Sequence, residues 1–182
     1  MRQAAIIFSL LATSMSLTAK AQQPLTIPQI NKEVLSAANS YAKAISCVEE
    51  LATPKTIFAL DPLKAEEDFD EGKYLVFWIG DVGCLGGNAT ISFNHAVVRA
   101  NHRGYFYVDA LHSSPAIDGV ESRFVQKFVG NSKDTMVVDQ LEYDEQDSNN
   151  SPSLKYRVTY QIDDDSGKWK ILEKKNLPYK PQ

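Results

Sequence analysis

The hydrophobic pattern of this chain changes its period once, near Lys73, and that change constrains the fold more than any other feature. Between Thr26 and Leu51 the apolar residues recur at steps of three and four, which predicts one amphipathic helix. Thr26 and Gln29 match a capping box at its start, and Thr53-Pro54 marks its end. Beyond Lys73 the pattern is typical of strands.

The run from Tyr74 to Ile79 is apolar at every position, which predicts a central strand covered on both faces. Polar residues 101–104 predict a hairpin loop that pairs Ala100 with Tyr105. This register places one set of side chains on the core face, namely Ile91, Phe93, His95 and Val97 with Phe106, Val108, Ala110 and His112. The strands expected after the first one are 90–100, 105–111, 123–129, 135–143, 154–162 and 168–173.

These elements predict an α+β domain in which one N-terminal helix packs on a curled antiparallel sheet of about six to seven strands. The order of elements resembles that of cystatin-like and NTF2-like folds. The alternative is a β-sandwich with the helix at its edge. Because the sequence has no internal repeat and no linker, we expect residues 22–182 to form a single domain.

Residues 1–21 have the pattern of a secretory signal peptide. Arg2 precedes the apolar stretch Ala4–Ala12, and Ala19-Lys20-Ala21 forms a small-residue cleavage site. A membrane anchor would need about 20 apolar residues, more than this stretch supplies. We therefore expect cleavage after Ala21 and a periplasmic or secreted protein, with no membrane span after signal removal.

The chain contains two cysteines, Cys47 and Cys84. A pair of cysteines in an exported protein meets an oxidising environment, which favours a disulfide. The alternative is that Cys84 is a nucleophile with a histidine as its base.

Charge limits the class of partner. Removing Arg2 and Lys20 from the 19 basic residues leaves 17 against 23 acidic residues, a net charge of −6. Nucleic acid is not an expected partner, because binding its backbone requires clustered positive charge. The acidic stretch that includes Asp68, Asp70 and Glu71 is interpreted as a solvated loop or as a contact surface for a basic protein.

A glycine-rich segment follows the apolar strand and includes Asp81, Gly83, Gly86 and Gly87. It lacks the spacing of a phosphate-binding loop, and a strand rather than a helix follows it. One interpretation is a tight turn that carries Cys84 to Cys47, with Asp81 accepting hydrogen bonds from the loop amides. The other is a partner-binding loop held by a rigid scaffold.

The three histidines, His95, His102 and His112, gather on the predicted hairpin. A zinc site would need a third ligand, and Asp109 points to the opposite face in the register above, so neither metal nor another cofactor is expected. The chain also lacks the common hydrolase motifs, which makes an enzyme the less favoured interpretation.

Two functions are consistent with these observations. The first is a small protein-binding domain, for example an inhibitor or immunity protein against a cell-envelope enzyme or toxin. Its acidic residues would attract a basic target electrostatically, and its rigid loop would make the contact. The second is an NTF2-like pocket protein that binds a small ligand or acts as an isomerase, with a cavity lined by Tyr41, Trp78, Phe93 and His95.

Overall fold

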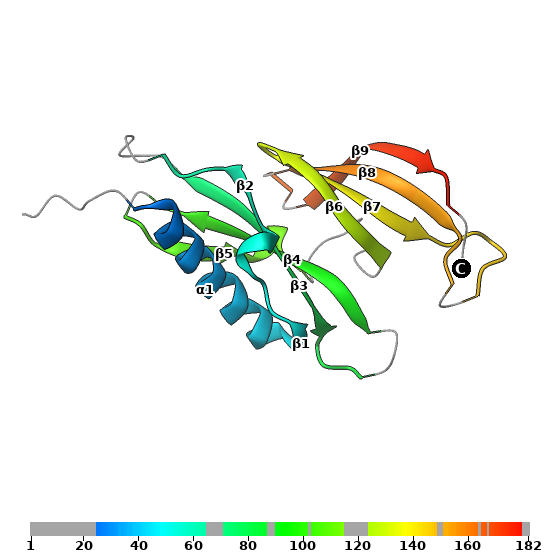
Figure 1. The fold of residues 1–182 in the computed structure, drawn as a ribbon, viewed down its shortest axis with the longest axis horizontal. Coiled ribbons are helices and arrows are strands. Elements are labelled where there is room, and N and C mark those ends of the chain that lie inside the picture. The colour runs from blue at the N-terminus through cyan, green and yellow to red at the C-terminus, as the bar shows by residue number, and fades with distance from the viewer. Residues whose placement is uncertain are drawn as a thin grey trace, which may run out of the picture.

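The computed structural model shows a mostly β fold with one helix (Figure 1). It describes residues 25–64, 71–86, 90–101, 103–114, 124–148, 151–163, 165–166 and 168–179. The predicted leader lies outside the described residues, as do Asp68, Asp70, Gly87 and His102.

Helix α1 (Ile27–Ile45) begins at the predicted capping box, where the Gln29 side chain accepts a hydrogen bond from the backbone N–H of Thr26 at 2.9 Å. It buries the stripe Ile30, Val34, Ala38 and Ala42. The helix is shorter than predicted. Both the hydroxyl and the backbone N–H of Ser46 donate to the carbonyl of Ala42, and the chain then turns into strand β1 (Ser46–Glu50).

Five strands form the first sheet: β1, β2 (Ile57–Asp61), β3 (Gly72–Val82), β4 (Ile91–Ala100) and β5 (Phe106–Asp109). Strand β3 is central, with β4 on one side. On its other side β1 pairs with the C-terminal part of β3 and β2 with the N-terminal part, separated by the short 3₁₀ helix η1 (Pro54–Thr56).

Four strands form the second sheet, in the order β6 (Val125–Ser132), β7 (Thr135–Glu142), β8 (Leu154–Asp163) and β9 (Lys168–Leu177). The single helix and the antiparallel pairing confirm those parts of the sequence prediction. The single curled sheet is wrong, because the strands divide between two sheets. The helix also covers a face of the first sheet rather than an edge of a sandwich (Figure 1).

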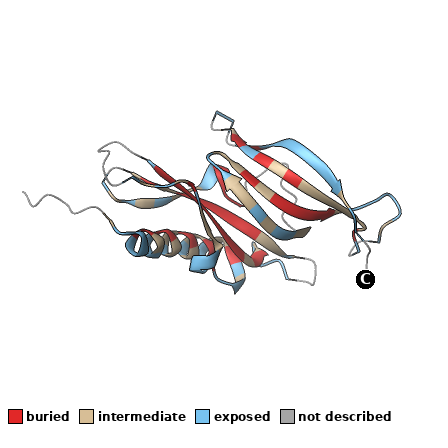
Figure 2. Cartoon of the chain, turned by 45° about the horizontal axis from the view of Figure 1, so that its top comes forward, coloured by how far each residue is buried: buried red, intermediate tan, exposed pale blue. Residues whose placement is uncertain are grey.

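The layers are held by two apolar cores on the opposite faces of β3. On one face, Tyr74, Val76 and Trp78 pack against the buried stripe of α1. On the other, Leu75 and Phe77 pack against the inner side chains of the second sheet, which include Val138 and Tyr160. The prediction of a central strand covered on both faces is therefore confirmed, and buried residues follow the strands where the layers meet (Figure 2).

Polar contacts also join the two sheets. Lys73 forms an ion pair with Asp134 at 2.9 Å, and the indole N–H of Trp169 donates to the carbonyl of His112 at 3.1 Å. The side-chain amide of Asn131 donates to the carbonyl of Ala59 at 2.6 Å. These contacts fix the second sheet on the first at several separated points.

The β4–β5 hairpin differs from its predicted register by one residue. Ala100 pairs with Phe106 rather than with Tyr105, because the loop closes through the Asn101 N–H, which donates to the Tyr105 carbonyl. A slip of one residue exchanges the faces of a strand. Phe106 and Val108 therefore pack on the helix side, opposite the face that carries His95 and Val97.

We predict that Gly80→Ala destabilises the protein by about 1–3 kcal/mol, because a Cβ there would lie 2.9 Å from the backbone oxygen of Cys47 on the neighbouring strand. The measurement is the free energy of unfolding in urea. The matched control is Gly130→Ala, where a Cβ meets no atom within 4 Å. Equal stability of the two variants would contradict the close approach of β1 to β3.

Candidate functional site

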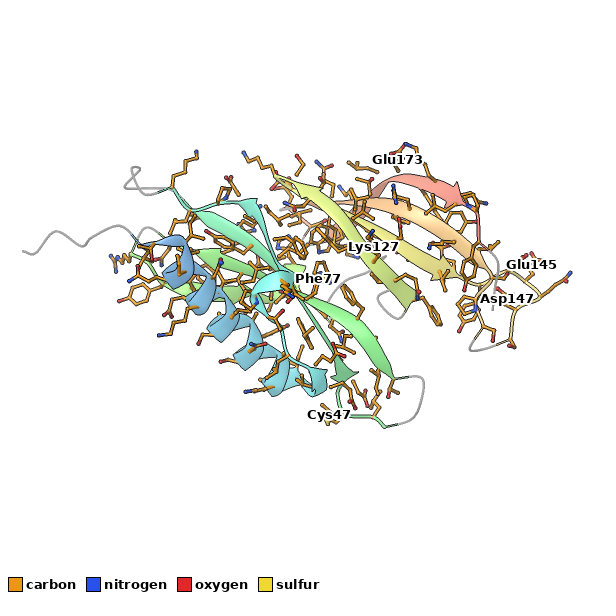
Figure 3. The ribbon with its side chains drawn as sticks, viewed as in Figure 1. Cys47, Phe77, Lys127, Glu145, Asp147 and Glu173 are labelled. Carbon is orange, nitrogen blue, oxygen red and sulfur yellow. A yellow bond between two sulfur atoms is a disulfide. The ribbon has the colours of Figure 1, made fainter. Side chains whose placement is uncertain are left out.

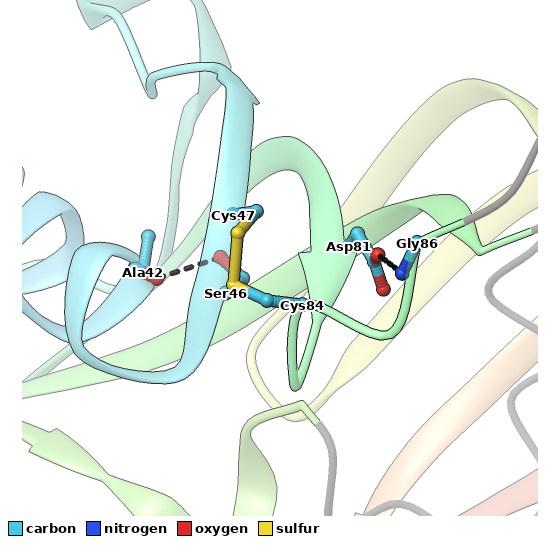
Figure 4. Close-up of a disulfide and its surroundings, with 6 residues drawn as sticks. All are labelled: Ala42, Ser46, Cys47, Asp81, Cys84 and Gly86. Atoms are coloured by element: carbon cyan, nitrogen blue, oxygen red, sulfur yellow. Dashed lines mark hydrogen bonds between the residues drawn. A yellow bond between two sulfur atoms is a disulfide. The ribbon is translucent and has the colours of Figure 1, made fainter.

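The two cysteines form a disulfide that joins β1 to the turn after β3 (Figure 4). The Cα atoms of Cys47 and Cys84 lie 5.1 Å apart, so the predicted bridge is confirmed. The alternative of a nucleophilic Cys84 is wrong, because its sulfur is bonded to that of Cys47.

Residues 83–86 form the described part of a loop that we call the disulfide loop. Three hydrogen bonds join its backbone to two elements, α1 and β3. The N–H of Gly83 donates to the Ile45 carbonyl at the end of α1 (2.8 Å), the N–H of Cys84 donates to the Asp81 carbonyl (3.1 Å), and the N–H of Gly86 donates to Asp81 Oδ2 (2.8 Å; Figure 4). The predicted role of Asp81 in holding the loop amides matches this geometry.

The disulfide loop turns through left-handed backbone. The φ angles are 80° at Gly83, 52° at Cys84 and 74° at Gly86. Glycine adopts this region without steric cost, whereas Cys84 is held there by its bridge and by the neighbouring hydrogen bonds. The loop therefore depends on glycine at positions 83 and 86, where other residues would be strained.

The side chain that this loop presents to solvent is Leu85, which is 79% exposed. Sequence reasoning selected the glycines and missed this residue, although an apolar side chain among glycines was the available signal. Beneath it, Asp81 is 6% exposed, and its Oδ1 is buried without a hydrogen-bond partner among the described residues. The buried Asp81 side chain therefore stabilises the loop through its hydrogen bond to Gly86 and is not accessible to a partner.

The acidic residues of the predicted contact surface do not join this loop. Glu71 immediately precedes β3, whereas Asp81 and Gly83 lie at its other end. A strand of 11 residues spans about 35 Å, so Glu71 is separated from the loop by most of the length of the sheet. Asp68, Asp70 and Gly87 are outside the described residues.

The four residues of the predicted pocket lie on two faces of the first sheet. Tyr41 and Trp78 contact each other on the helix side, with ring centroids 6.2 Å apart. Phe93 and His95 lie on the opposite face, where each ring approaches Phe77. The Trp78 indole nitrogen has no partner among the described residues, but the side chains around it are those of the helix–sheet core.

His95 lies in the seam between the sheets, where it is 2% exposed and contacts the edge of Trp169. Burial disfavours its charged form and lowers the pKa of His95 to about 4, although a backbone hydrogen bond to His112 opposes that shift. Its Nε2 has no hydrogen-bond partner in the described part of the chain. The imidazole is therefore neutral at physiological pH.

A partly buried network of Arg99, Asp109 and His112 lies near His95 and was not predicted from the sequence. The i, i+3 spacing of Asp109 and His112 could have indicated it. Asp109 Oδ2 accepts from Arg99 Nε and lies 2.7 Å from His112 Nδ1. Burial opposes ionisation of Asp109, but these two neighbours outweigh it and lower the pKa of that carboxyl. His112 Nε2 faces the Asp163 carbonyl at 3.4 Å, so both ring nitrogens face protein groups rather than a substrate.

Within the described ranges, no group of three His, Cys, Asp or Glu side chains is placed to hold a metal ion. Of the helices that the structure describes, none has the length and apolar character that crossing a bilayer requires. Comparison of the chain with models of protein families, with curated proteins and with solved structures finds no match. The disulfide loop is the site with the most specific geometry.

We predict that replacing both cysteines with serine lowers the free energy of unfolding by about 4 kcal/mol, since the bridge closes a separation of 37 residues in the unfolded chain. Urea unfolding with and without a reducing agent measures the effect. The reductant should lower the stability of the wild-type protein to that of the variant and leave the variant unchanged. A difference below about 1 kcal/mol would contradict this role of the bridge.

A second prediction concerns pH. The unfolded chain takes up a proton on His95 near pH 6.5, whereas the folded protein resists it until about pH 4. The stability contributed by neutral His95 is therefore complete above about pH 6.5 and is lost as the pH falls toward 4, by up to about 3 kcal/mol. In urea unfolding at several pH values, His95→Gln should lose less stability than the wild type over this interval. Parallel pH profiles would contradict the assignment.

Proposed function

We propose that this chain is an exported protein-binding domain and that the disulfide loop is its contact with the partner. The observation that carries the proposal is the exposure of Leu85 on a backbone tied to α1, β1 and β3. Burying a leucine side chain in a pocket of a partner removes its apolar surface from water, which contributes about 1.5–3 kcal/mol. A loop fixed before binding loses little conformational entropy on association.

Further exposed side chains at this end of the first sheet could contact the partner together with Leu85. Ile91, which pairs with Asp81 at the start of β4, is 42% exposed. Glu49 and Glu50 are exposed on β1, the strand that the disulfide holds against this end of the sheet. The site therefore combines an apolar anchor with nearby negative charge, which fits a basic partner surface.

Export supports the same function. The expected cleavage after Ala21 would deliver the chain to the periplasm or the exterior, and disulfides persist in these oxidising compartments. We propose a cell-envelope enzyme or toxin as the target, for which this chain acts as an inhibitor or immunity protein. Glu71 lies too far from Leu85 to touch the same small surface, so any contribution it makes is long-range steering.

The alternative function, an NTF2-like pocket protein that binds a small ligand or acts as an isomerase, has less support. Its proposed lining residues lie on opposite faces of β3 and β4, with Trp78 on the helix side and His95 in the seam between the sheets. A single cavity cannot be lined by both.

We predict that Leu85→Asp weakens partner binding at least tenfold without unfolding the protein, because a charge would replace the apolar anchor on an exposed loop. The measurement is capture from envelope extract with residues 22–182, followed by affinity measurement on the captured protein. The matched control is Leu111→Asp, which changes a leucine that is 66% exposed in the short 3₁₀ helix η2 (Ala110–His112) after β5.

Affinity should fall at least tenfold for Leu85→Asp and stay unchanged for Leu111→Asp, with equal melting temperatures. Failure to capture any protein at low or physiological salt would overturn the proposed function. Equal capture by both variants would exclude the disulfide loop as the contact.

A further inference from the structure

The outer face of the second sheet carries a different kind of surface. In β6–β9, alternate side chains point inward to the core that contains Val138, Val158 and Tyr160, and the intervening ones point outward. No helix or strand that the structure describes packs on the outward side (Figure 1), although Tyr179 contacts Lys155 there. The described contacts of these strands with η2 (Ala110–His112) and β2 lie on the inner side.

Basic side chains outnumber acidic ones on this outer face. Cross-strand register places Lys127, Asp139, Arg157 and Lys175 in one row across the four strands. The outward basic residues are Lys127, Lys155, Arg157, Lys168, Lys170 and Lys175, and the outward acidic residues are Asp139, Asp163 and Glu173.

Each of the three acidic side chains is already paired with a basic neighbour on the same face. Asp139 pairs with Arg157, Asp163 with Lys170, and Glu173 with Lys175. The face thus carries six basic and three acidic side chains, although the chain as a whole has a net charge of −4.

Acidic residues of this half of the chain gather instead in the turn between β7 and β8. Glu145 and Asp147 lie in that turn at the end of the sheet, whereas Lys127 lies on the sheet itself (Figure 3). Charge is thus segregated between the broad face and the turn. Such segregation makes the face attractive to a negatively charged ligand even when the whole protein is acidic.

We propose that the outer face of the second sheet binds a linear anionic polysaccharide. Five of its six basic residues are lysines, which act as hydrated point charges and suit a regularly charged chain rather than one bidentate anion. Thr135, Thr159 and Gln161 lie on the same face and offer hydrogen-bonding groups for sugar hydroxyls.

The side chains of this face favour a polysaccharide over a single-stranded nucleic acid or a lipid surface. A nucleic-acid strand would need a row of aromatic side chains on which successive bases stack. Phe128, Tyr160 and Trp169 point into the core, and Tyr179, which lies against Lys155, is a single ring after the end of β9. A membrane-binding face needs apolar side chains that insert between lipids. Leu141, on the outward side of β7, is instead buried.

The test measures binding of residues 22–182 to dextran sulfate and polygalacturonate, with neutral dextran, anionic phospholipid vesicles and an oligothymidine as comparisons. The double variant Lys127→Glu/Lys155→Glu reverses two charges on the face. The matched control, Lys32→Glu/Lys43→Glu, makes the same change on exposed positions of α1, in the layer on the other side of the first sheet.

We predict binding to both anionic polysaccharides at about 50 mM salt that weakens at about 500 mM, because screening shortens the reach of the lysine charges. The face variant should bind at least tenfold more weakly and the helix variant as tightly as the wild type. Lys127→Gln/Lys155→Gln should show a smaller loss, and thermal unfolding should confirm that all variants are folded.

Absence of binding to both polysaccharides at low salt would overturn the proposal. It would also be overturned by equal losses in the two Glu variants, or by tighter binding to the vesicles or the oligothymidine. Because Leu85 lies on the first sheet, these outcomes are independent of partner capture through the disulfide loop.

Discussion

Burial of β3 on both faces is the constraint on which the rest of this structure depends. Its 11 residues alternate between two apolar cores, so the strand is stable only between two covering layers. The single helix supplies one layer. A second sheet must supply the other, which is why strands that could have extended the first sheet form a separate one.

The two ends of β3 then serve different purposes. At its start, Lys73 pairs with Asp134 and joins the sheets. At its end, the chain leaves the layers and enters the disulfide loop, which is tied to the helix through the Ile45 carbonyl and to β1 through Cys47. Residues 83–86 are therefore held to the layers by a disulfide and hydrogen bonds, although the Leu85 side chain is exposed to solvent.

Local signals in the sequence predicted the helix start, the central strand and the disulfide, because capping, apolar runs and cysteine pairing act over short distances or by elimination. The relation between strands was not predictable in the same way. Trp78 pairs with Asn94, so Phe93 and His95 face away from it. A change of one residue in register exchanges the faces, and nothing local distinguishes the two arrangements. The division into two sheets was expected only in the alternative, a β-sandwich with the helix at its edge, because no local signal assigns a strand to one sheet or the other.

The lysines of β9 have a consequence for how copies of this protein meet. Among the described strands, β9 pairs only with β8, so it is an edge strand of the second sheet. Such an edge is a template for uncontrolled strand addition. Lys168, Lys170, Lys174 and Lys175, together with the irregular pairing near Thr159, make a second identical edge a poor match. Long charged side chains on an edge strand disfavour pairing with another strand, so the lysines of β9 oppose edge-to-edge aggregation.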